Sequence, residues 1–198
     1  AALNNRRGYQ PRGKVLGGSS SINAMVYIRG QHADYDHWAA QGNPGWGWED
    51  VKPYFLRAEN NERGANDWHG RGGPFNVADL RAPNRFSQYF TDAGVQAGHP
   101  HNTDFNGATQ EGVGLYQVTH KNGERHSAAK GYLTPHLARP NLQVITGAHA
   151  TRILFDGTRA VGVEYRQGGA IKQVRAGREV LLSAGALLSP QLLMLSGV

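Results

Sequence analysis

The sequence predicts a mixed α/β fold, and three observations carry this prediction. Apolar residues recur with helical spacing in the first 140 positions, which predicts helices at 33–40, 48–59 and 84–96. Short strand-like runs, separated by turn residues, dominate the remainder of the chain. The last residues combine an apolar strand pattern, a turn of small residues and a helical segment. Helices and strands therefore both contribute, and they do so in separate stretches of the chain.

The helical part begins after an extended arm that contains a Gly/Ser turn. The helix at 84–96 is expected to bury Phe86, Tyr89 and Phe90 on one face. The loop at 60–73 is polar, rich in glycine and too long for a simple connector, and loops of this kind often form lids or binding segments. Ser127 is expected to cap a short helix that follows it.

Strand-like runs occupy the C-terminal third. The predicted strands are 142–146, 150–155, 160–165, 171–175 and 180–183. The last of them leads through Ala184-Gly185-Ala186 into a helix. This geometry places backbone N–H groups at a helix N-terminus, where an anion or a ribose can approach.

The composition is that of a soluble globular protein of one or two domains, with 39% hydrophobic and 18% charged residues in 198. No apolar run is long enough to cross a bilayer. The absence of cysteine excludes a disulfide framework and fits a reducing compartment. We therefore expect a cytoplasmic protein, with peripheral attachment to the inner membrane as the alternative.

Two further ligand classes are disfavoured by the distribution of basic residues and histidines. The net charge of +6 comes from scattered lysines and arginines, with no basic stripe interleaved with aromatic residues, so no nucleic-acid partner is expected. His99 and His101 have a spacing seen in metal sites, but no third group of ligands accompanies them. No metal is expected.

The most informative stretch is residues 13–23, with the sequence GKVLGGSSSIN. Its adjacent glycines, Gly17 and Gly18, allow a sharp turn that brings bare N–H groups against a ligand. Three serines add hydroxyl groups without bulk, and apolar residues follow at once. This chemistry suits a diphosphate at one end and a flat apolar ring at the other. An ordinary Gly/Ser loop is the alternative.

Longer patterns support the ligand-binding interpretation. Residues 13–30, together with Asp34–Trp38, resemble the first signature of the glucose-methanol-choline (GMC) flavoprotein oxidoreductases, and residues 183–198 resemble the second. Residues 67–70, 123–127 and 139–142 match the family as well. The resemblance covers essentially the whole chain and is closest to the bacterial choline dehydrogenase and alcohol dehydrogenase branch.

The resemblance implies an FAD-dependent alcohol oxidoreductase. In this family a histidine base takes the hydroxyl proton of an alcohol, and the hydrogen on carbon leaves as a hydride to flavin N5, which gives an aldehyde. The Gly-x-Gly-x-x-Gly unit with which the family begins does not occur in this sequence, and the family's catalytic histidine follows the second signature. The chain therefore resembles an internal piece of a longer enzyme. It is expected to lack catalytic residues and to be inactive alone.

Within that resemblance the chain is part of the FAD-binding domain with part of the substrate-domain region. Residues 1–30 hold the Gly/Ser turn, 31–140 the helices and loops, and 141–198 the strand-rich return to the FAD-binding domain. The expected partners are a small alcohol, the missing N- and C-terminal parts of the same enzyme and an electron acceptor of unknown type. A homo-oligomer is left open. Choline dehydrogenase proper and a non-redox nucleotide-binding module are the alternative functions.

The resemblance also assigns cofactor-binding residues. Those expected along the flavin are Leu16, Gly17, Gly18, Ser19, Asn23, Ala24, Met25 and Val26, with the glycines and Ser19 at the ribityl-phosphate and the last four near the isoalloxazine. Ala150 matches a position whose backbone contacts adenine, and Ala184 and Gly185 are expected near the adenosine. Core packing is the alternative for both alanines. Some family members attach FAD through a histidine where this chain has Ile22, so FAD is expected to bind non-covalently.

Overall fold

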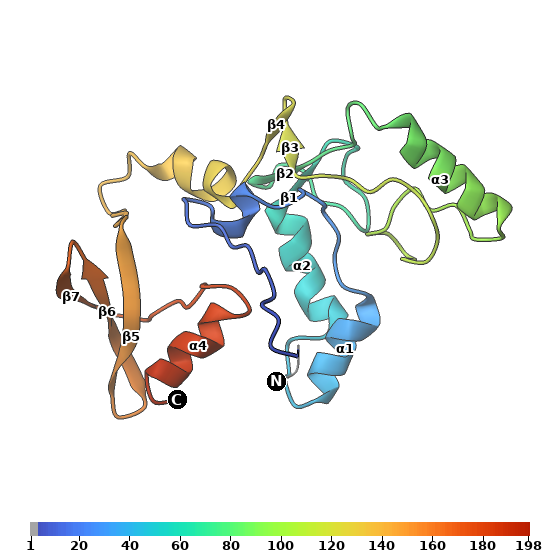
Figure 1. The fold of residues 1–198 in the computed structure, drawn as a ribbon. Coiled ribbons are helices and arrows are strands. Elements are labelled where there is room, and N and C mark those ends of the chain that lie inside the picture. Colours follow the sequence, from blue (N-terminus) through green and yellow to red (C-terminus); the bar gives the residue numbers. More distant parts are fainter. Residues whose placement is uncertain (1–3) are drawn as a thin grey trace. The chain divides into compact units, whose positions relative to one another are not determined.

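The structure is a computed structural model that describes residues 4–198 and confirms the mixed α/β class (Figure 1). The chain forms two compact units. The first ends at Arg139 and the second spans Pro140–Val198.

Three helices in unit 1 lie where the apolar spacing predicts them: α1 (His32–Ala40), α2 (Trp48–Ala58) and α3 (Arg85–Gln96). An aspartate in the first turn helps to fix the start of α1 and of α2. The Gln31 N–H donates to Asp34 Oδ2 at 2.8 Å, and the Gly47 N–H donates to Asp50 Oδ2 at 3.2 Å. Both carboxylates satisfy backbone donors that the helix leaves unpaired and oppose the positive end of its dipole.

The face of α3 differs from the prediction. Phe86, Tyr89 and Phe90 are exposed by 64%, 57% and 76%, whereas Thr91 is the buried residue of this helix. The 3.6-residue period correctly predicts a helix but does not say whether a partner covers its apolar side.

Asn84 is the N-cap of α3, because its side-chain oxygen accepts a hydrogen bond from the Phe86 N–H at 2.9 Å. We expect Asn84→Ala to lower the free energy of unfolding by about 1 kcal/mol, since it removes the partner of an otherwise unsatisfied donor. Urea unfolding monitored by circular dichroism measures this loss. Asn84→Asp, which keeps an acceptor, is the control and should unfold close to wild type. An equal loss in both variants would contradict the capping role.

Unit 1 is centred on short strands that the sequence did not predict. Strands β1 (Glu59–Asn61) and β2 (Phe75–Val77) pair in parallel, and β3 (His120–Lys121) pairs antiparallel with β4 (Glu124–Arg125). Val118 forms isolated bridges to both Val26 and Ala78. The fully buried Val77 and its neighbours Ala78 and Val118 form the core here. The N-terminal arm is thereby anchored to the core just after the Gly/Ser turn.

The C-terminal end of unit 1 is a short irregular helix. A π-helix at Ala129–Leu133 is followed by a 3-10 turn at Thr134–His136. Ser127 Oγ accepts from the Lys130 N–H at 3.3 Å, at the beginning of this segment.

Unit 2 is an antiparallel sheet with one helix. Strands β5 (Ala148–Asp156), β6 (Arg159–Gln167) and β7 (Ala170–Arg175) pair in sequence order. Helix α4 (Leu188–Leu195) packs against β5. Ser196, the C-cap of α4, accepts a hydrogen bond at its Oγ from the N–H of Ile153, the buried residue of β5, at 2.8 Å.

Two predicted strands of unit 2 are wrong. Residues 142–146 and 180–183 have no regular secondary structure and form no ladder, and Leu181 is 80% exposed. A strand requires a hydrogen-bonded neighbour, and none of residues 4–198 pairs with either segment.

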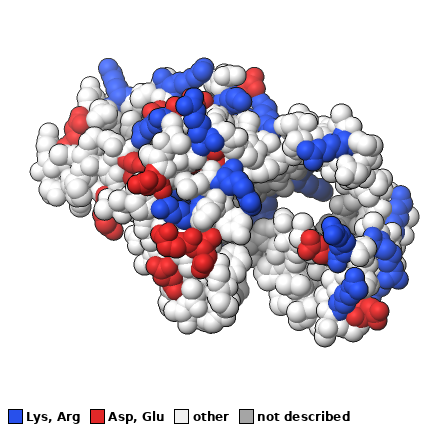
Figure 2. Space-filling view, turned by 180° about the vertical axis from the view of Figure 1, so that it is seen from behind, with Lys and Arg blue, Asp and Glu red and all other residues white. Residues whose placement is uncertain are grey.

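Charged side chains of both signs are intermixed over the face drawn in Figure 2, and the basic ones form no single stripe there. Among the helices of residues 4–198, none is long and apolar enough to cross a membrane.

Candidate functional site

The Gly/Ser turn is built from two consecutive glycines in the left-handed region. Gly17 has φ 89° and Gly18 φ 54°, and a 3-10 helix at Gly18–Ser21 begins there. The Gly18 N–H donates to Val15 O at 2.9 Å and the Asn23 N–H donates to Ser19 O at 2.9 Å. Left-handed backbone is costly for any residue with a Cβ, which explains glycine at both positions.

The first glycine of the motif closes the turn from the other side. A Cβ on Gly13 would lie 2.1 Å from Gly18 O and 2.8 Å from Ser19 N, both backbone atoms. The Gly13 N–H also donates to Ser19 Oγ at 3.2 Å. The arm and the turn therefore touch backbone to backbone.

The three serine hydroxyls take part in holding the turn together. Besides Ser19, Ser20 Oγ donates to Gly17 O and accepts from the Ala128 N–H at 2.9 Å, and Ser21 Oγ donates to Leu16 O at 2.8 Å. The sequence predicted these hydroxyls as ligand donors. Their bonds within the protein give them a structural role as well.

The residues after the turn adopt a second strained conformation. Met25 has φ 65°, in the left-handed region that residues with a Cβ rarely occupy. Its N–H donates to Asn23 Oδ1 at 3.1 Å, and its carbonyl accepts from the Thr119 N–H at 2.8 Å. These bonds hold the strained backbone in place. Such strain persists where the surroundings enforce it, and it is frequent at ligand sites.

The eight predicted flavin residues of unit 1 lie at positions 16–19 and 23–26, in and just after the turn. Leu16, Ser19, Asn23 and Ala24 are exposed, whereas Gly17, Gly18, Met25 and Val26 are half-buried. The three remaining predicted residues lie in unit 2. Ala150 pairs with Tyr165 in the sheet, and Ala184 and Gly185 precede α4.

Among the described residues 4–198, neither alanine of unit 2 lies in a core. Ala150, Ala184 and Gly185 are all exposed. Gly185 has φ 91°, and its carbonyl accepts from the Ser189 N–H at 2.9 Å. The Ala184 N–H donates to Ser189 Oγ at 3.1 Å.

Unit 1 contains a buried network of charged side chains that the sequence did not predict. Glu59, which is completely buried, accepts from Arg29 Nη2 at 2.8 Å, from the Gly70 N–H at 2.9 Å and from Asn61 Nδ2 at 3.0 Å. His69 bridges Glu59 Oε1 at 3.0 Å and Asp104 Oδ2 at 2.9 Å. Two sequence signals pointed to the region of His69: the match of residues 67–70 to the family and the length and polarity of the loop 60–73.

The network shifts the pKa values of its members in opposite directions. Burial alone would raise the pKa of Glu59, but hydrogen bonds from His69, Gly70 and Asn61 and the charge of Arg29 outweigh it and lower the pKa. Burial alone would lower the pKa of His69, but hydrogen bonds to Glu59 and Asp104 outweigh it and raise the pKa. The charged forms of both residues are therefore favoured in the folded protein.

These shifts predict a stability maximum in mildly acidic solution. The raised pKa of His69 gives a contribution that is complete below its ordinary pKa of about 6.5 and is lost as pH rises through the folded value. The lowered pKa of Glu59 gives one that is complete above about 4.3 and is lost as pH falls through the folded value. Urea unfolding at closely spaced pH values should show the largest free energy of unfolding between these limits.

The control for this pH dependence is His69→Gln, which cannot titrate. We expect the decline in stability above about pH 6.5 to be much shallower in this variant than in wild type. An equally steep decline in both proteins would show that His69 is not its source.

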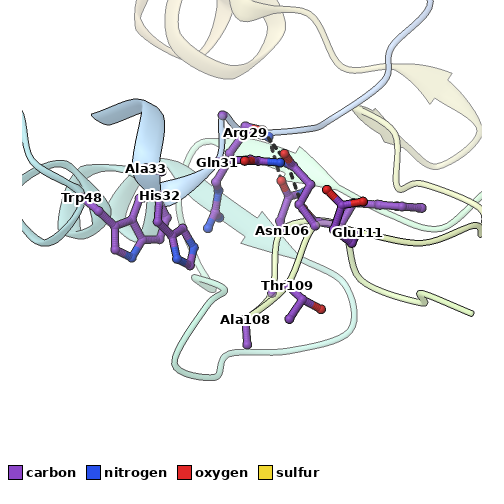
Figure 3. A pocket seen from close by; sticks show the side chains of 13 residues that line it. Arg29, Gln31, His32, Ala33, Trp48, Asn106, Ala108, Thr109 and Glu111 are labelled. Carbon is purple, nitrogen blue, oxygen red and sulfur yellow. Dashed lines mark hydrogen bonds between the residues drawn. The ribbon is translucent and has the colours of Figure 1, made fainter. Parts of the chain in front are cut away.

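A cavity of about 320 Å³ adjoins the network. It is lined by residues 29–33 and Trp48 on one side and by the loop 105–111 on the other (Figure 3). The loop is held by Asn106, whose side chain accepts from the Arg29 N–H at 2.7 Å and donates to Tyr27 O at 3.0 Å. None of the predicted cofactor residues lines this cavity.

Within residues 4–198 no three or more His, Asp or Glu side chains are arranged to hold a metal ion. His101 forms an isolated bridge to Val113. The histidine with charged partners is His69, and both of its ring nitrogens are engaged by carboxylates.

Two curated proteins are similar to nearly the whole chain. An alcohol dehydrogenase [acceptor] of Pseudomonas putida is 51% identical over 99% of this chain and 36% of its own length. An oxygen-dependent choline dehydrogenase of Sinorhizobium fredii is 49% identical over 99% and 36%. The chain thus spans about a third of the length of these relatives.

Solved structures share the fold. Pyridoxine 4-oxidase from Mesorbium loti is 34% identical over 94% of this chain and 37% of its own, with a TM-score of 0.85. An FAD-dependent oxidoreductase from Chaetomium thermophilum is 32% identical over 100% and 37%, with a TM-score of 0.90. The family model of GMC oxidoreductases matches residues 1–198. Because this match covers the whole chain, the chain belongs to the GMC oxidoreductase family.

Proposed function

We propose that this chain is the cofactor-holding part of an FAD-dependent alcohol oxidoreductase that converts an alcohol to an aldehyde. The observation that carries the proposal is the partly exposed segment from Leu16 to Val26, which holds three residues, Gly17, Gly18 and Met25, in the left-handed region. Conformations of this kind bring backbone N–H groups close to a ligand. Family membership supplies the identity of the ligand as FAD.

The residues present fit such a group. A Cβ added to Gly18 would meet no atom within 4 Å, so the turn is open on that side. Among residues 4–198 no acceptor bonds the Ala24 N–H, which leaves a donor for a ligand. The side chains of Leu16 and Ile22 are 46% and 50% exposed, which offers apolar contact to a flat ring. Backbone donors next to apolar side chains suit a phosphate-linked aromatic cofactor.

The roles of the chain's residues follow from this fit. Gly17, Gly18 and Ser19 are proposed to follow the ribityl-phosphate, and Asn23–Val26 to lie against the flavin ring. Ala150, Ala184 and Gly185 are proposed to contact the adenosine. When bound, the flavin accepts a hydride from the alcohol carbon at N5, which is chemistry that protein side chains do not supply. The protein's task is to bind and orient.

We propose that FAD is held non-covalently. Ile22 has no nucleophilic atom, and it occupies the position at which some family members use a histidine for attachment. Extraction of all flavin into acid supernatant, with none left on the precipitated protein, is the expected result.

The proposed substrate is an unspecialised primary alcohol, in keeping with the relative of Pseudomonas putida. Choline is the second candidate, because the relative of Sinorhizobium fredii is a choline dehydrogenase at nearly the same identity. The proposal assigns no catalytic base to residues 1–198, so this stretch alone is expected not to oxidise alcohols.

The first experiment is a visible absorption spectrum of the purified protein that contains this chain, followed by addition of alcohols under anaerobic conditions. Oxidised-flavin absorption that bleaches with a primary alcohol supports the proposal, and stronger bleaching with choline selects the second substrate. A protein that binds adenine nucleotides, remains colourless and takes up no added FAD is a non-redox nucleotide-binding module, and the proposal fails.

A further inference from the structure

The Gly/Ser turn and the strained Met25 meet at one side chain that comes from the other end of unit 1. Arg125 Nη1 donates to Asn23 Oδ1 at 2.7 Å and to Ser20 O at 3.1 Å. These are the direct side-chain bonds from β4 to the segment. One guanidinium thus joins Ser20, in the 3-10 helix of the turn, to Asn23, the first of the residues proposed to lie against the flavin ring.

The hairpin that carries Arg125 has little freedom. In the β3–β4 ladder Arg125 pairs with His120, and the two strands are joined by Asn122 and Gly123, with φ 53° and 81°. Two consecutive left-handed residues, Asn-Gly, form the tight turn whose twist matches a hairpin. The hairpin therefore fixes the backbone of Arg125, and the Thr119 N–H just before β3 donates to Met25 O at 2.8 Å, which places this hairpin next to the segment.

Asn23 transmits this contact to Met25. The same Asn23 Oδ1 that accepts from Arg125 also accepts from the Met25 N–H at 3.1 Å. A left-handed Met25 is unfavourable by itself, and the bond to Asn23 is what its N–H gains in that conformation. Loss of Arg125 would remove one of the two donors that fix the Asn23 side chain and so weaken its bond to the Met25 N–H, which would leave the Met25 backbone held by the Thr119 N–H at its carbonyl.

The charges around Arg125 leave its guanidinium free for this role. The neighbouring Glu124 is paired with Lys130, and Arg125 is in no ion pair within the described residues 4–198. The following residues also touch the turn, because the Ala128 N–H donates to Ser20 Oγ and a Cβ on Gly17 would lie 3.2 Å from Ala129 Cβ. The stretch 125–129 packs against the turn as a whole.

We propose that Arg125 is a positioning residue that holds Asn23, and through it the left-handed Met25, in the conformation that receives the flavin ring. This inference rests on the proposed function for the identity of the ligand. It adds a residue that neither signature contains and that is more than a hundred positions away in sequence.

The first test needs no flavin. Hydrogen exchange of the Met25 amide, measured by NMR in the flavin-free protein that contains this chain, reports the bond to Asn23 directly. We expect exchange to be at least about tenfold faster in Arg125→Gln than in wild type, because a charge-assisted hydrogen bond supports the acceptor. Arg57→Gln, an exposed arginine stacked on Tyr54, is the matched control and should leave this amide unchanged. Unchanged exchange in Arg125→Gln would overturn the proposal.

The second test measures FAD affinity. Arg125→Gln is expected to weaken binding by about tenfold or more, and Arg125→Lys by less, since lysine keeps the charge and can reach one of the two acceptors. In an Asn23→Ala background the Arg125→Gln substitution should have little further effect, because both act through one hydrogen-bonded chain. Additive losses of FAD affinity would show that Arg125 does not act through Asn23.

A glycine at position 25 separates positioning from general damage. Glycine adopts left-handed backbone without support, so Arg125→Gln should weaken FAD binding much less in a Met25→Gly background than in wild type. If wild type binds FAD and Arg125→Gln binds equally well, the inference fails and the proposed function stands. If wild type binds no FAD, the proposed function fails, and amide exchange alone decides whether Arg125 positions the segment.

Discussion

Replacing Glu59 by alanine is expected to lower the free energy of unfolding by about 3–5 kcal/mol, the largest loss that we predict for any side chain in unit 1. The carboxylate is completely buried and is the shared acceptor for Arg29, Asn61, His69 and the Gly70 N–H. Its removal leaves the Arg29 guanidinium, in a side chain only 3% exposed, without an opposite charge. An uncompensated buried charge is far more costly than the pair is stabilising.

Urea unfolding of wild type and two variants measures this effect. Glu59→Gln keeps the side-chain volume and one carbonyl acceptor, so its loss should be clearly smaller than that of Glu59→Ala. Glu124→Ala is the matched control, because its partner Lys130 is half exposed and surface ion pairs contribute little. Equal unfolding curves for Glu59→Ala and Glu124→Ala would mean that the buried network does not stabilise unit 1.

Glu59→Ala should also increase the mobility of the loop 105–111, which lines the cavity. His69 connects Glu59 to Asp104, which precedes residues 105–111 by one position. We therefore expect Glu59→Ala to loosen this loop before unit 1 unfolds as a whole, since local opening begins where supporting contacts are fewest.

The features that the sequence predicts correctly are local ones. Helices α1, α2 and α3 begin and end within one residue of the ranges expected from apolar spacing, because a 3.6-residue period is readable from a dozen neighbouring positions. The hairpins of β5–β7 follow from alternating apolar residues with Asp156-Gly157 and Gly168-Gly169 between them. The Gly/Ser turn is local too, and Gly17 and Gly18 have the positive φ that adjacent glycines indicate.

The features that were missed depend on residues far apart in sequence. Arg29, Glu59, His69 and Asp104 come from separate segments, and no pattern along the chain shows that they share one buried site. The hydrogen bond between Arg125 and Asn23 was missed for the same reason, although Asn23 itself was predicted to lie near the flavin. The wrong strands at 142–146 and 180–183 show the converse limit, because β-propensity is expressed only where a neighbouring strand supplies hydrogen bonds.

Gly13→Ala is expected to weaken FAD binding by about a hundredfold, the largest effect on the cofactor that the structure predicts. Its Cβ would lie 2.1 Å from Gly18 O, and backbone on both sides leaves no flexible side chain to yield. Overpacking typically costs about 1–3 kcal/mol, and a clash between backbone segments falls at the upper end of this range. The turn must open to relieve it, which displaces the N–H groups proposed to contact the phosphate.

Substitutions at two other glycines serve as comparisons for the FAD affinity of Gly13→Ala. Gly18→Ala has space for its Cβ but retains a left-handed φ of 54°, so it should weaken binding by a smaller factor, about tenfold. Gly177→Ala has neither a close neighbour nor a positive φ and should bind FAD like wild type. FAD titrations followed by quenching of flavin fluorescence would rank the three variants. If Gly13→Ala binds FAD as tightly as Gly177→Ala, the contact between arm and turn does not shape the cofactor site, and the other contacts of the segment from Leu16 to Val26, such as those from Arg125, Ala128 and Thr119, are enough to hold it.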